Sequence, residues 1–177
     1  MHSEPIRMLD CASYCDGAAA IVMCSEGAAK RFRKMIKGYF LAGSLATDSL
    51  SLAKRKSLTT IESAAKSAKK AFEIAKLKPS DINLIEAPDI VPISEILAVE
   101  SLGFAKKGTG IQFIKSNLEK INPTGGLKAC GNAVGATGVR QAVDILSQLN
   151  NKKLKYGLSN TIAGTGSVSA VNIFGVK

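Results

Sequence analysis

Segments with helical periodicity alternate along this chain with short apolar runs typical of strands, and this alternation restricts the folds open to it. The clearest helix covers residues 59–75, where apolar positions recur at helical spacing: Ile61, Ala64, Ala65, Ala68, Phe72 and Ala75. We predict further helices over residues 92–102 and 139–149, and strands over residues 39–44, 82–87, 154–160 and 168–174. Helices that alternate with strands predict a layered α/β fold. Because the last two strands follow one another without a helix, we expect a mixed sheet covered by helices.

Three local patterns make more specific predictions. Thr59 is followed by Glu62, a capping-box pattern in which each side chain satisfies the other residue's free backbone N–H at a helix start. Residues 18–24 read Ala-Ala-Ala-Ile-Val-Met-Cys, a continuous small and apolar run that predicts a buried strand. Residues 122–126 read Asn-Pro-Thr-Gly-Gly, a combination that predicts a turn.

Composition excludes several classes of protein. With 177 residues, of which 46% are hydrophobic and 21% charged, the chain is long enough to bury a core without disulfides. No apolar stretch approaches the roughly 18 residues of a membrane span. The first residues lack the basic start and apolar run of a signal peptide, so we expect a cytoplasmic protein. The four cysteines form no CxxC pair and the one histidine is His2, so we expect no metal site.

The charge of the chain points to an anionic partner. A net charge of +10 favours association with a polyanion such as nucleic acid, anionic lipid or a phosphorylated cofactor. Only 5% of residues are aromatic and Trp is absent, which argues against nucleic acid because bases stack on aromatic side chains. Lysines spread along helices are equally typical of a solvated surface, and both interpretations stay open.

The most unusual segment covers residues 122–138 and leads into the helix predicted at 139–149. Its glycines at positions 131, 135 and 138 do not match G-x-G-x-x-G, and no Walker-type Gly-Lys-Ser/Thr follows, so neither phosphate-binding motif is present. A glycine turn before a helix can present free backbone N–H groups to an anion. The alternative is a tight turn that needs glycine only for close packing.

This segment resembles the thiolase family, in which Asn-Pro-Ser/Thr-Gly-Gly is followed by Gly-His-Pro-x-Gly-Ala-Thr-Gly before a helix. Here residues 122–126 and 131–138 read Asn-Pro-Thr-Gly-Gly and Gly-Asn-Ala-Val-Gly-Ala-Thr-Gly. Three more stretches are similar to thiolase segments in the same order: Asp-Gly-Ala-Ala-Ala at 16–20, the stretch 93–104 with Ile-Ser-Glu-Ile-Leu, and Gly-Thr-Gly at 164–166. The resemblance implies a thiolase-like layered fold, with residues 1–30 as the trailing segment of the first thiolase half and residues 31–177 as the C-terminal domain.

Three positions depart from the pattern that the resemblance implies. Asn132 stands where thiolases carry the histidine that activates their nucleophilic cysteine, and an amide cannot accept a proton at neutral pH. Pro88-Asp89 stands where the family has His-Asp or Asn-Glu, and Pro88 has no side-chain donor for an oxyanion. The C-terminal turn, residues 160–164, lacks the second cysteine of many thiolases.

From the resemblance we expect a set of site residues. The catalytic candidates are Asn132, at the family's histidine position, together with Asp89 and Cys130. The expected substrate-binding residues are Gly131, Gly135, Asn160 and Gly164, and no metal is expected. Cys130 is either a substitute nucleophile near a helix N-terminus or a small buried residue.

The resemblance implies a subunit that handles acyl-CoA thioesters, with coenzyme A or acyl-CoA as substrate or ligand and no tightly bound cofactor. We expect it to be inactive alone as an acyltransferase and to be completed by a separate chain that carries the first thiolase half with the nucleophilic cysteine. A homo- or hetero-oligomer is expected, because a lone half exposes an apolar face. The alternatives are a non-catalytic acyl-CoA-binding, lipid-binding or scaffold subunit of a thiolase-containing complex, and a fragment of a longer thiolase.

Overall fold

A mixed four-stranded sheet forms the centre of the molecule. The computed structural model describes residues 4–31 and 36–176. The strands are β1 (Tyr39–Thr47), β2 (Leu84–Glu86), β3 (Tyr156–Ala163) and β4 (Val168–Gly175), arranged in the order β1-β4-β3-β2. β4 runs antiparallel to both β1 and β3, whereas β2 pairs parallel to β3. The α/β fold class and the mixed sheet predicted from the sequence are confirmed.

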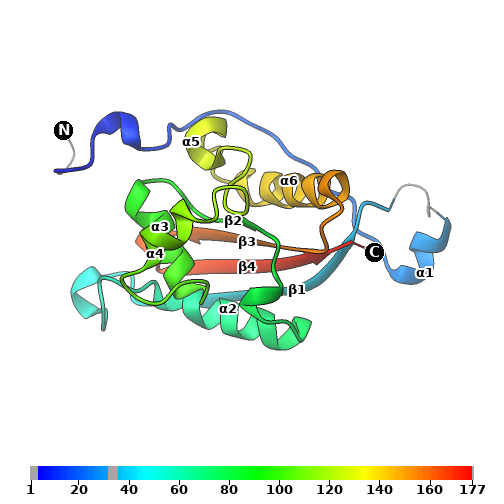
Figure 1. Cartoon of the computed structure of the whole chain (residues 1–177), viewed down its shortest axis with the longest axis horizontal. Coiled ribbons are helices and arrows are strands. Elements are labelled where there is room, and N and C mark those ends of the chain that lie inside the picture. The colour runs from blue at the N-terminus through cyan, green and yellow to red at the C-terminus, as the bar shows by residue number, and fades with distance from the viewer. Residues whose placement is uncertain (1–3, 32–35, 177) are drawn as a thin grey trace.

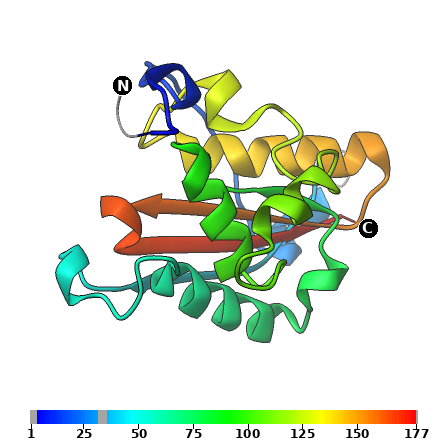
Figure 2. The ribbon, with the colours of Figure 1, turned by 60° about the vertical axis from the view of Figure 1, so that its left-hand side comes forward.

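Helices cover the two faces of this sheet (Figures 1 and 2). α2 (Glu62–Ala75) packs against β1 and β4 on one face, and α6 (Thr137–Lys152) packs mainly against β3 on the other. The remaining helices are short: α1 (Glu26–Ala29), α3 (Pro92–Ser101), α4 (Gly110–Lys115) and α5 (Gly126–Cys130). α3 and α4 pack against each other. Within the described part of the chain, none of the helices has the length and apolar character needed to cross a bilayer.

The strand predicted at residues 18–24 is wrong. This segment is extended but pairs with no described strand, and its apolar side chains face the solvent. Val22 is 96% exposed and Met23 is 65% exposed. An apolar run forms a buried strand only where neighbouring strands and a covering layer surround it, and the described residues supply neither at this place.

The capping box predicted at Thr59 and Glu62 is also wrong, although the helix itself is confirmed. α2 begins at Glu62, so Ile61 rather than Thr59 occupies the cap position. The backbone N–H of Ile61 donates to the hydroxyl of Ser101 at 2.9 Å. The N–H of Thr59 donates to the hydroxyl of Ser57 at 3.2 Å. A side chain from the end of α3 therefore satisfies the backbone N–H of the residue before α2, and no side chain caps the helix in the way that the local pattern predicted.

Two groups of buried side chains form the core, one on each face of the sheet. On the α2 face, Ala64, Ala68 and Phe72 pack against Val171 and Ile173 of β4. On the α6 face, Ile145 and Leu149 pack with Leu84 and Phe174. Gly157 of β3 lies under Ile145 so closely that a Cβ at this position would collide with the isoleucine. The absence of a side chain at Gly157 lets α6 lie close to the sheet.

We expect the substitution Ile145→Ala to lower the free energy of unfolding by about 2–5 kcal/mol, because it leaves a cavity between α6 and the sheet. Ile145 is 0% exposed, whereas Val143 on the same helix is 39% exposed. The control Val143→Ala should change stability by no more than about 0.5 kcal/mol. Urea denaturation followed by circular dichroism measures both, and equal effects would show that α6 is not packed as described.

Candidate active-site pocket

The turn predicted at residues 122–126 is present and lies at the carboxyl end of β2. The N–H of Gly125 donates to the carbonyl of Asn122 at 2.8 Å, which closes the turn. Gly125 and Gly126 have φ angles of 93° and 63°, a left-handed conformation that glycine adopts without steric cost. The side-chain oxygen of Asn122 accepts the N–H of Ala87 at 2.8 Å, which fixes the turn against the end of β2.

Three carboxylates from β2 and the segment that follows it hold this turn and the start of α5. Glu95 accepts a hydrogen bond from the Asn122 amide at 2.7 Å. Glu86 accepts one from the Thr124 hydroxyl at 3.2 Å. Asp89 accepts two from backbone N–H groups at the N-terminus of α5, where the helix dipole favours a negative charge. These contacts fix the segment that leads to Asn132.

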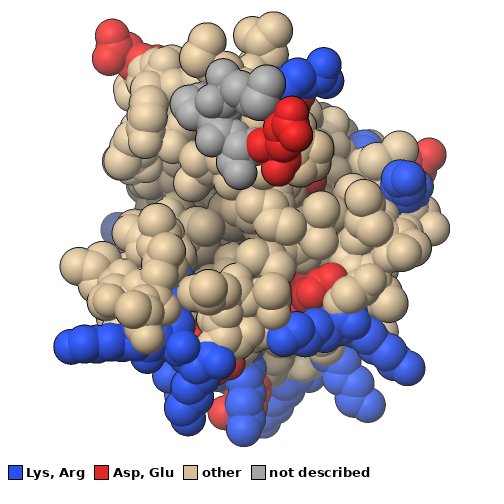
Figure 3. Space-filling model, turned by 90° about the vertical axis from the view of Figure 1, so that its left-hand side faces the viewer, with Lys and Arg blue, Asp and Glu red and all other residues tan. Residues whose placement is uncertain are grey.

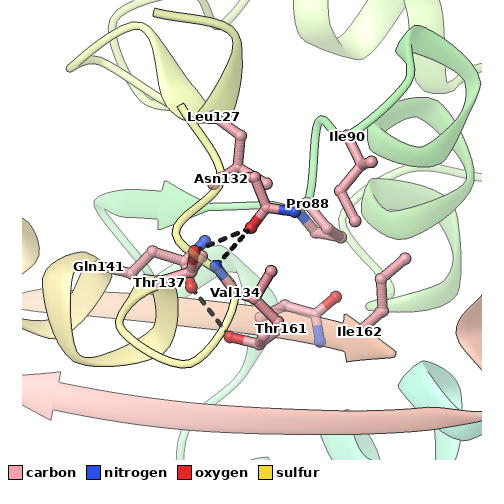
Figure 4. Close-up of a pocket in the computed structure, with 10 residues that line it drawn as sticks. Pro88, Ile90, Leu127, Asn132, Val134, Thr137, Gln141, Thr161 and Ile162 are labelled. Carbon is pink, nitrogen blue, oxygen red and sulfur yellow. Dashed lines mark hydrogen bonds between the residues drawn. The ribbon is translucent and has the colours of Figure 1, made fainter. Parts of the chain in front are cut away.

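Asn132 is buried and its amide oxygen is held by two donors. The oxygen accepts the N–H of Val134 at 3.2 Å and the hydroxyl of Thr137 at 3.0 Å. The backbone N–H of Asn132 donates to the carbonyl of Ser13 at 2.8 Å, which fastens the N-terminal segment to this turn. In Figure 4 the amide nitrogen of Asn132 points toward Pro88. The side chain therefore presents a donor, not an acceptor, on that side.

Asn132 lines a small pocket of about 50 Å³ between the end of β2, the start of α6 and the far half of β3 (Figure 4). Its apolar lining consists of Pro88, Ile90, Leu127, Val134 and Ile162. Its polar lining consists of Asn132, Thr137, Gln141, Asn160 and Thr161. No Lys, Arg, Asp or Glu lies among these residues, so the pocket suits a small neutral group.

The structure brings together only some of the residues expected from the sequence. Asn132 and Asn160 line the pocket, and so does Pro88. Asn160 is completely buried and its amide nitrogen donates to the Ser169 hydroxyl at 2.7 Å and to the Ala170 carbonyl at 3.0 Å. Its amide oxygen has no hydrogen-bond partner among the described residues.

The other expected residues lie outside the pocket lining. Asp89 caps α5, as described above, and Cys130 is exposed, with its sulfur 3.9 Å from the carbonyl oxygen of Thr124. Gly135 and Gly164 are exposed. Gly131 ends α5 with a φ of 78°, and a Cβ there would lie 2.5 Å from the sulfur of Cys15, so this glycine serves close packing.

Three polar residues of the pocket were not expected from the sequence: Thr137, Gln141 and Thr161. Thr137 and Gln141 are four residues apart on α6 and therefore share one face of the helix. The hydroxyl of Thr161 donates to the side-chain oxygen of Gln141 at 3.0 Å, which joins α6 to β3. The helical spacing of Thr137 and Gln141 was visible in the sequence, but their proximity to residue 161 was not.

A buried acid, Glu86, ends β2 two residues before Pro88 of the pocket. Glu86 is 1% exposed, and burial raises its pKa to about 7 although the nearby Arg140 opposes the shift. The Nη2 atom of Arg140 lies 3.8 Å from Oε2 of Glu86, and the other terminal nitrogen, Nη1, pairs with Asp144. The negative charges of Asp144 and Asp89 raise the pKa of Glu86 further, whereas the Thr124 hydroxyl lowers it. No group of three His, Cys, Asp or Glu side chains is placed to hold a metal ion within residues 4–31 and 36–176.

Figure 3 shows the end of the molecule to which the carboxyl ends of β2 and β3 point. A hollow separates an upper from a lower part, and Lys and Arg side chains gather along the lower edge, the side on which α2 lies in Figure 1. α2 exposes Lys66, Lys69 and Lys70, and the loop before it exposes Lys54 and Lys56. This basic edge attracts anions to the face of the molecule.

We expect Glu86 to make the stability of the protein depend on pH between about 4.5 and 7. Because its pKa is raised in the folded state, the protonated form is favoured there, and stability falls as the pH rises through this range. The substitution Glu86→Gln should leave stability unchanged near pH 4.5 and increase it by up to about 3 kcal/mol at pH 8.

Denaturant unfolding at the two pH values measures this difference. The matched control is Glu119→Gln, because Glu119 is exposed and should show the same small effect at both. A Glu86→Gln variant that is less stable than the wild-type protein at pH 8 would show that the ion pair with Arg140 outweighs the desolvation of Glu86.

Comparison with known proteins identifies the family of this chain. The family model for the thiolase C-terminal domain-like family matches residues 44–176. Acetyl-CoA acetyltransferase of Methanothermobacter thermautotrophicus is 38% identical over 98% of this chain and 49% of its own length. Sterol carrier protein 2 of Homo sapiens is 31% identical over 83% of this chain and 29% of its own length.

A solved structure shows the same fold. The crystal structure of human mitochondrial 3-ketoacyl-CoA thiolase aligns with a TM-score of 0.68 at 19% identity, over 87% of this chain and 34% of that one. The chain spans about half the length of the two acetyl-CoA acetyltransferases that it matches over almost its whole length. The chain belongs to the thiolase C-terminal domain-like family.

Proposed function

We propose that this chain is a subunit that binds acyl-CoA thioesters, holds the acyl end in the Asn132 pocket, and does not catalyse thiolysis alone. The observation that supports this proposal is the position of Asn132, which the motif resemblance assigns to the family's histidine position and which lines a small pocket in a thiolase-like fold. The pocket walls suit a small acyl group, because five of the ten lining residues are apolar.

The chemistry of the site supports binding more than catalysis. The amide of Asn132 cannot take a proton from a thiol, and its oxygen is already held by Val134 and Thr137. Removing a general base slows a reaction by roughly 10²–10⁴-fold. Pro88 offers no side-chain hydrogen to an oxyanion, and the exposed Cys130 does not line the pocket. No residue of the pocket therefore replaces the imidazole.

A partner completes the site in this proposal. Residues 1–30 act as the trailing segment of the first thiolase half and residues 31–177 as the C-terminal domain. The exposed apolar residues Ile21, Val22 and Met23 lie in an extended segment suited to pairing with another strand. A chain that carries the first half would cover them and supply the nucleophilic cysteine. A non-catalytic subunit of a thiolase-containing complex and a piece of a longer thiolase are the alternatives.

We expect Asn132→Ala to weaken acetyl-CoA binding about tenfold, because the variant loses the amide donor that faces the bound group or an ordered water. Calorimetric titration of the chain with acetyl-CoA measures the change. The matched control is Asn117→Ala: the Asn117 amide bonds to the carbonyl of Phe113, away from the pocket, so the affinity should stay unchanged. Equal affinity in both variants would assign Asn132 a purely structural role.

We expect the chain alone not to catalyse the thiolysis of acetoacetyl-CoA by free CoA. Its turnover number should lie well below the value of about 1 per second or more that is typical of enzymes. The variant Asn132→His restores a base and should gain activity when the first half of the Methanothermobacter acetyl-CoA acetyltransferase is supplied. A wild-type chain that turns over by itself, and loses this activity in Cys130→Ser, would contradict the proposal and make Cys130 the nucleophile. Absence of activity in the complemented histidine variant would favour the non-catalytic alternative.

A further inference from the structure

The side-chain amide of Gln141 is buried and forms a hydrogen bond through its oxygen, whereas its nitrogen forms none. It is 0% exposed and its oxygen accepts the hydroxyl hydrogen of Thr161. Its amide nitrogen is buried and has no hydrogen-bond partner within residues 4–31 and 36–176. A buried donor without an acceptor is rare in folded proteins, because it has lost its bonds to water without replacement. Such a donor is free to bond to an acceptor that arrives from outside the chain, provided that the acceptor can reach it.

The position of Gln141 places this donor at the pocket. Gln141 lies one helical turn after Thr137, which holds the oxygen of Asn132, and both residues line the same cavity. Figure 4 shows Gln141 bonded to Thr161 on the side of the pocket formed by α6 and β3. The bond to Thr161 orients the amide, so the nitrogen is held in place before any ligand binds.

A second glutamine of the same helix provides a comparison. Gln148 also has a side-chain nitrogen that is buried without a partner. It lies two helical turns further along α6 and is not among the residues that line the pocket. Gln141 and Gln148 therefore have the same side chain, lie on the same helix and both lack an acceptor for the amide nitrogen. They differ in that only Gln141 lines the pocket.

We propose that Gln141 recognises the acyl group by donating a hydrogen bond from its amide nitrogen to the carbonyl oxygen of a short acyl thioester. This inference rests on the proposed function. It adds which residue recognises the acyl group and that the acyl group is short. A thioester carbonyl only accepts hydrogen bonds, so it matches a donor without an acceptor. The unpaired oxygen of Asn160 is itself an acceptor and does not compete for this role.

The walls and size of the pocket define the group that fits. A carboxylate would lack a counter-ion, because no Lys or Arg lines the cavity. The cavity measures about 50 Å³. A cavity that holds benzene measures about 150 Å³, so this pocket suits a group of acetyl size rather than a long or polycyclic one. Apolar contacts from Pro88, Ile90 and Leu127 fit the methyl end of such a group.

Two ligands that differ only in the carbonyl test the inference. Acetyl-CoA carries the thioester carbonyl, whereas S-ethyl-CoA is a thioether without it. We expect the wild-type chain to bind acetyl-CoA about tenfold more tightly than S-ethyl-CoA in calorimetric titrations, since one hydrogen bond to a buried donor is lost. In Gln141→Met, an apolar substitution of similar length, this preference should fall severalfold, to what the Asn132 amide alone contributes. In the matched control Gln148→Met it should remain tenfold.

An infrared measurement gives a second readout that a structural role would not change. With acetyl-CoA labelled with ¹³C at the carbonyl, we expect the bound carbonyl band of the wild-type chain and of Gln148→Met at lower wavenumber than the free band. Gln141→Met should bring the band back toward its free position. If the variant does not fold, the wild-type spectrum still tests the inference, because an unshifted band overturns it.

The possible failures are distinguishable. If neither acetyl-CoA nor S-ethyl-CoA binds the wild-type chain, both the proposed function and the role of Gln141 are overturned. If both ligands bind with equal affinity, or if Gln141→Met keeps the preference and the shifted band, the role of Gln141 alone is overturned and a bound water satisfies its nitrogen. If octanoyl-CoA binds as tightly as acetyl-CoA, the restriction to a short acyl group is wrong.

Discussion

The pairing of β2 with β3 decides where the pocket lies. β2 is only three residues long and pairs with residues 157–159, while β3 continues to Ala163. Among the described residues, no strand therefore pairs with the far half of β3 on the side of β2, and the chain after β2 turns away through Pro88 toward α3. In parallel α/β sheets, ligands bind beyond the carboxyl ends of the strands. Here the pocket lies at the carboxyl end of β2, between the segment that follows β2 and the part of β3 that does not pair with β2.

Carboxyl groups link the walls of this pocket through hydrogen bonds. Glu86 ends β2, contacts the glycine turn through Thr124 and faces Arg140 of α6. Taking a carboxylate out of water disfavours its charged form, and this desolvation outweighs the attraction of Arg140, which explains the raised pKa of Glu86. Glu95, whose pKa is also raised by burial, and Asp89 make further contacts to the same turn. Three acids around one turn link β2, α3, α5 and α6 into a single framework.

The pocket itself is formed by neutral amides and hydroxyls rather than by acids and bases. Asn132 and Gln141 each use one oxygen to fix themselves to a hydroxyl group, of Thr137 and Thr161 respectively. The amide nitrogen of each residue then remains as a hydrogen-bond donor on a side chain that lines the cavity. A preorganised donor stabilises a carbonyl oxygen without having to reorient when the ligand arrives. This arrangement fits recognition of an acyl group better than proton transfer.

The sequence by itself determined the helices α2, α3 and α6, the four strands and the mixed sheet, because periodicity and glycine or proline boundaries are local properties of a chain. The glycine segment also pointed to Asn132 and to the thiolase-like fold. The strand predicted at residues 18–24 failed because a strand needs partners, and periodicity does not show whether they are present. The cap predicted at Thr59 failed because the helix begins only at Glu62, where Ile61 occupies the cap position and bonds to Ser101 of α3.

Only the tertiary structure decided which expected residues meet. Asp89 was expected at the reacting group, but its carboxylate lies on the backbone N–H groups of α5, because a free helix start is the nearest set of unpaired donors. Gln141 was not expected, because the sequence gives no sign that it faces Thr161 twenty residues later. Which side chains of α6 and β3 touch depends on how closely the helix lies on the sheet, and the contact between Gly157 and Ile145 sets that distance only once the chain is folded.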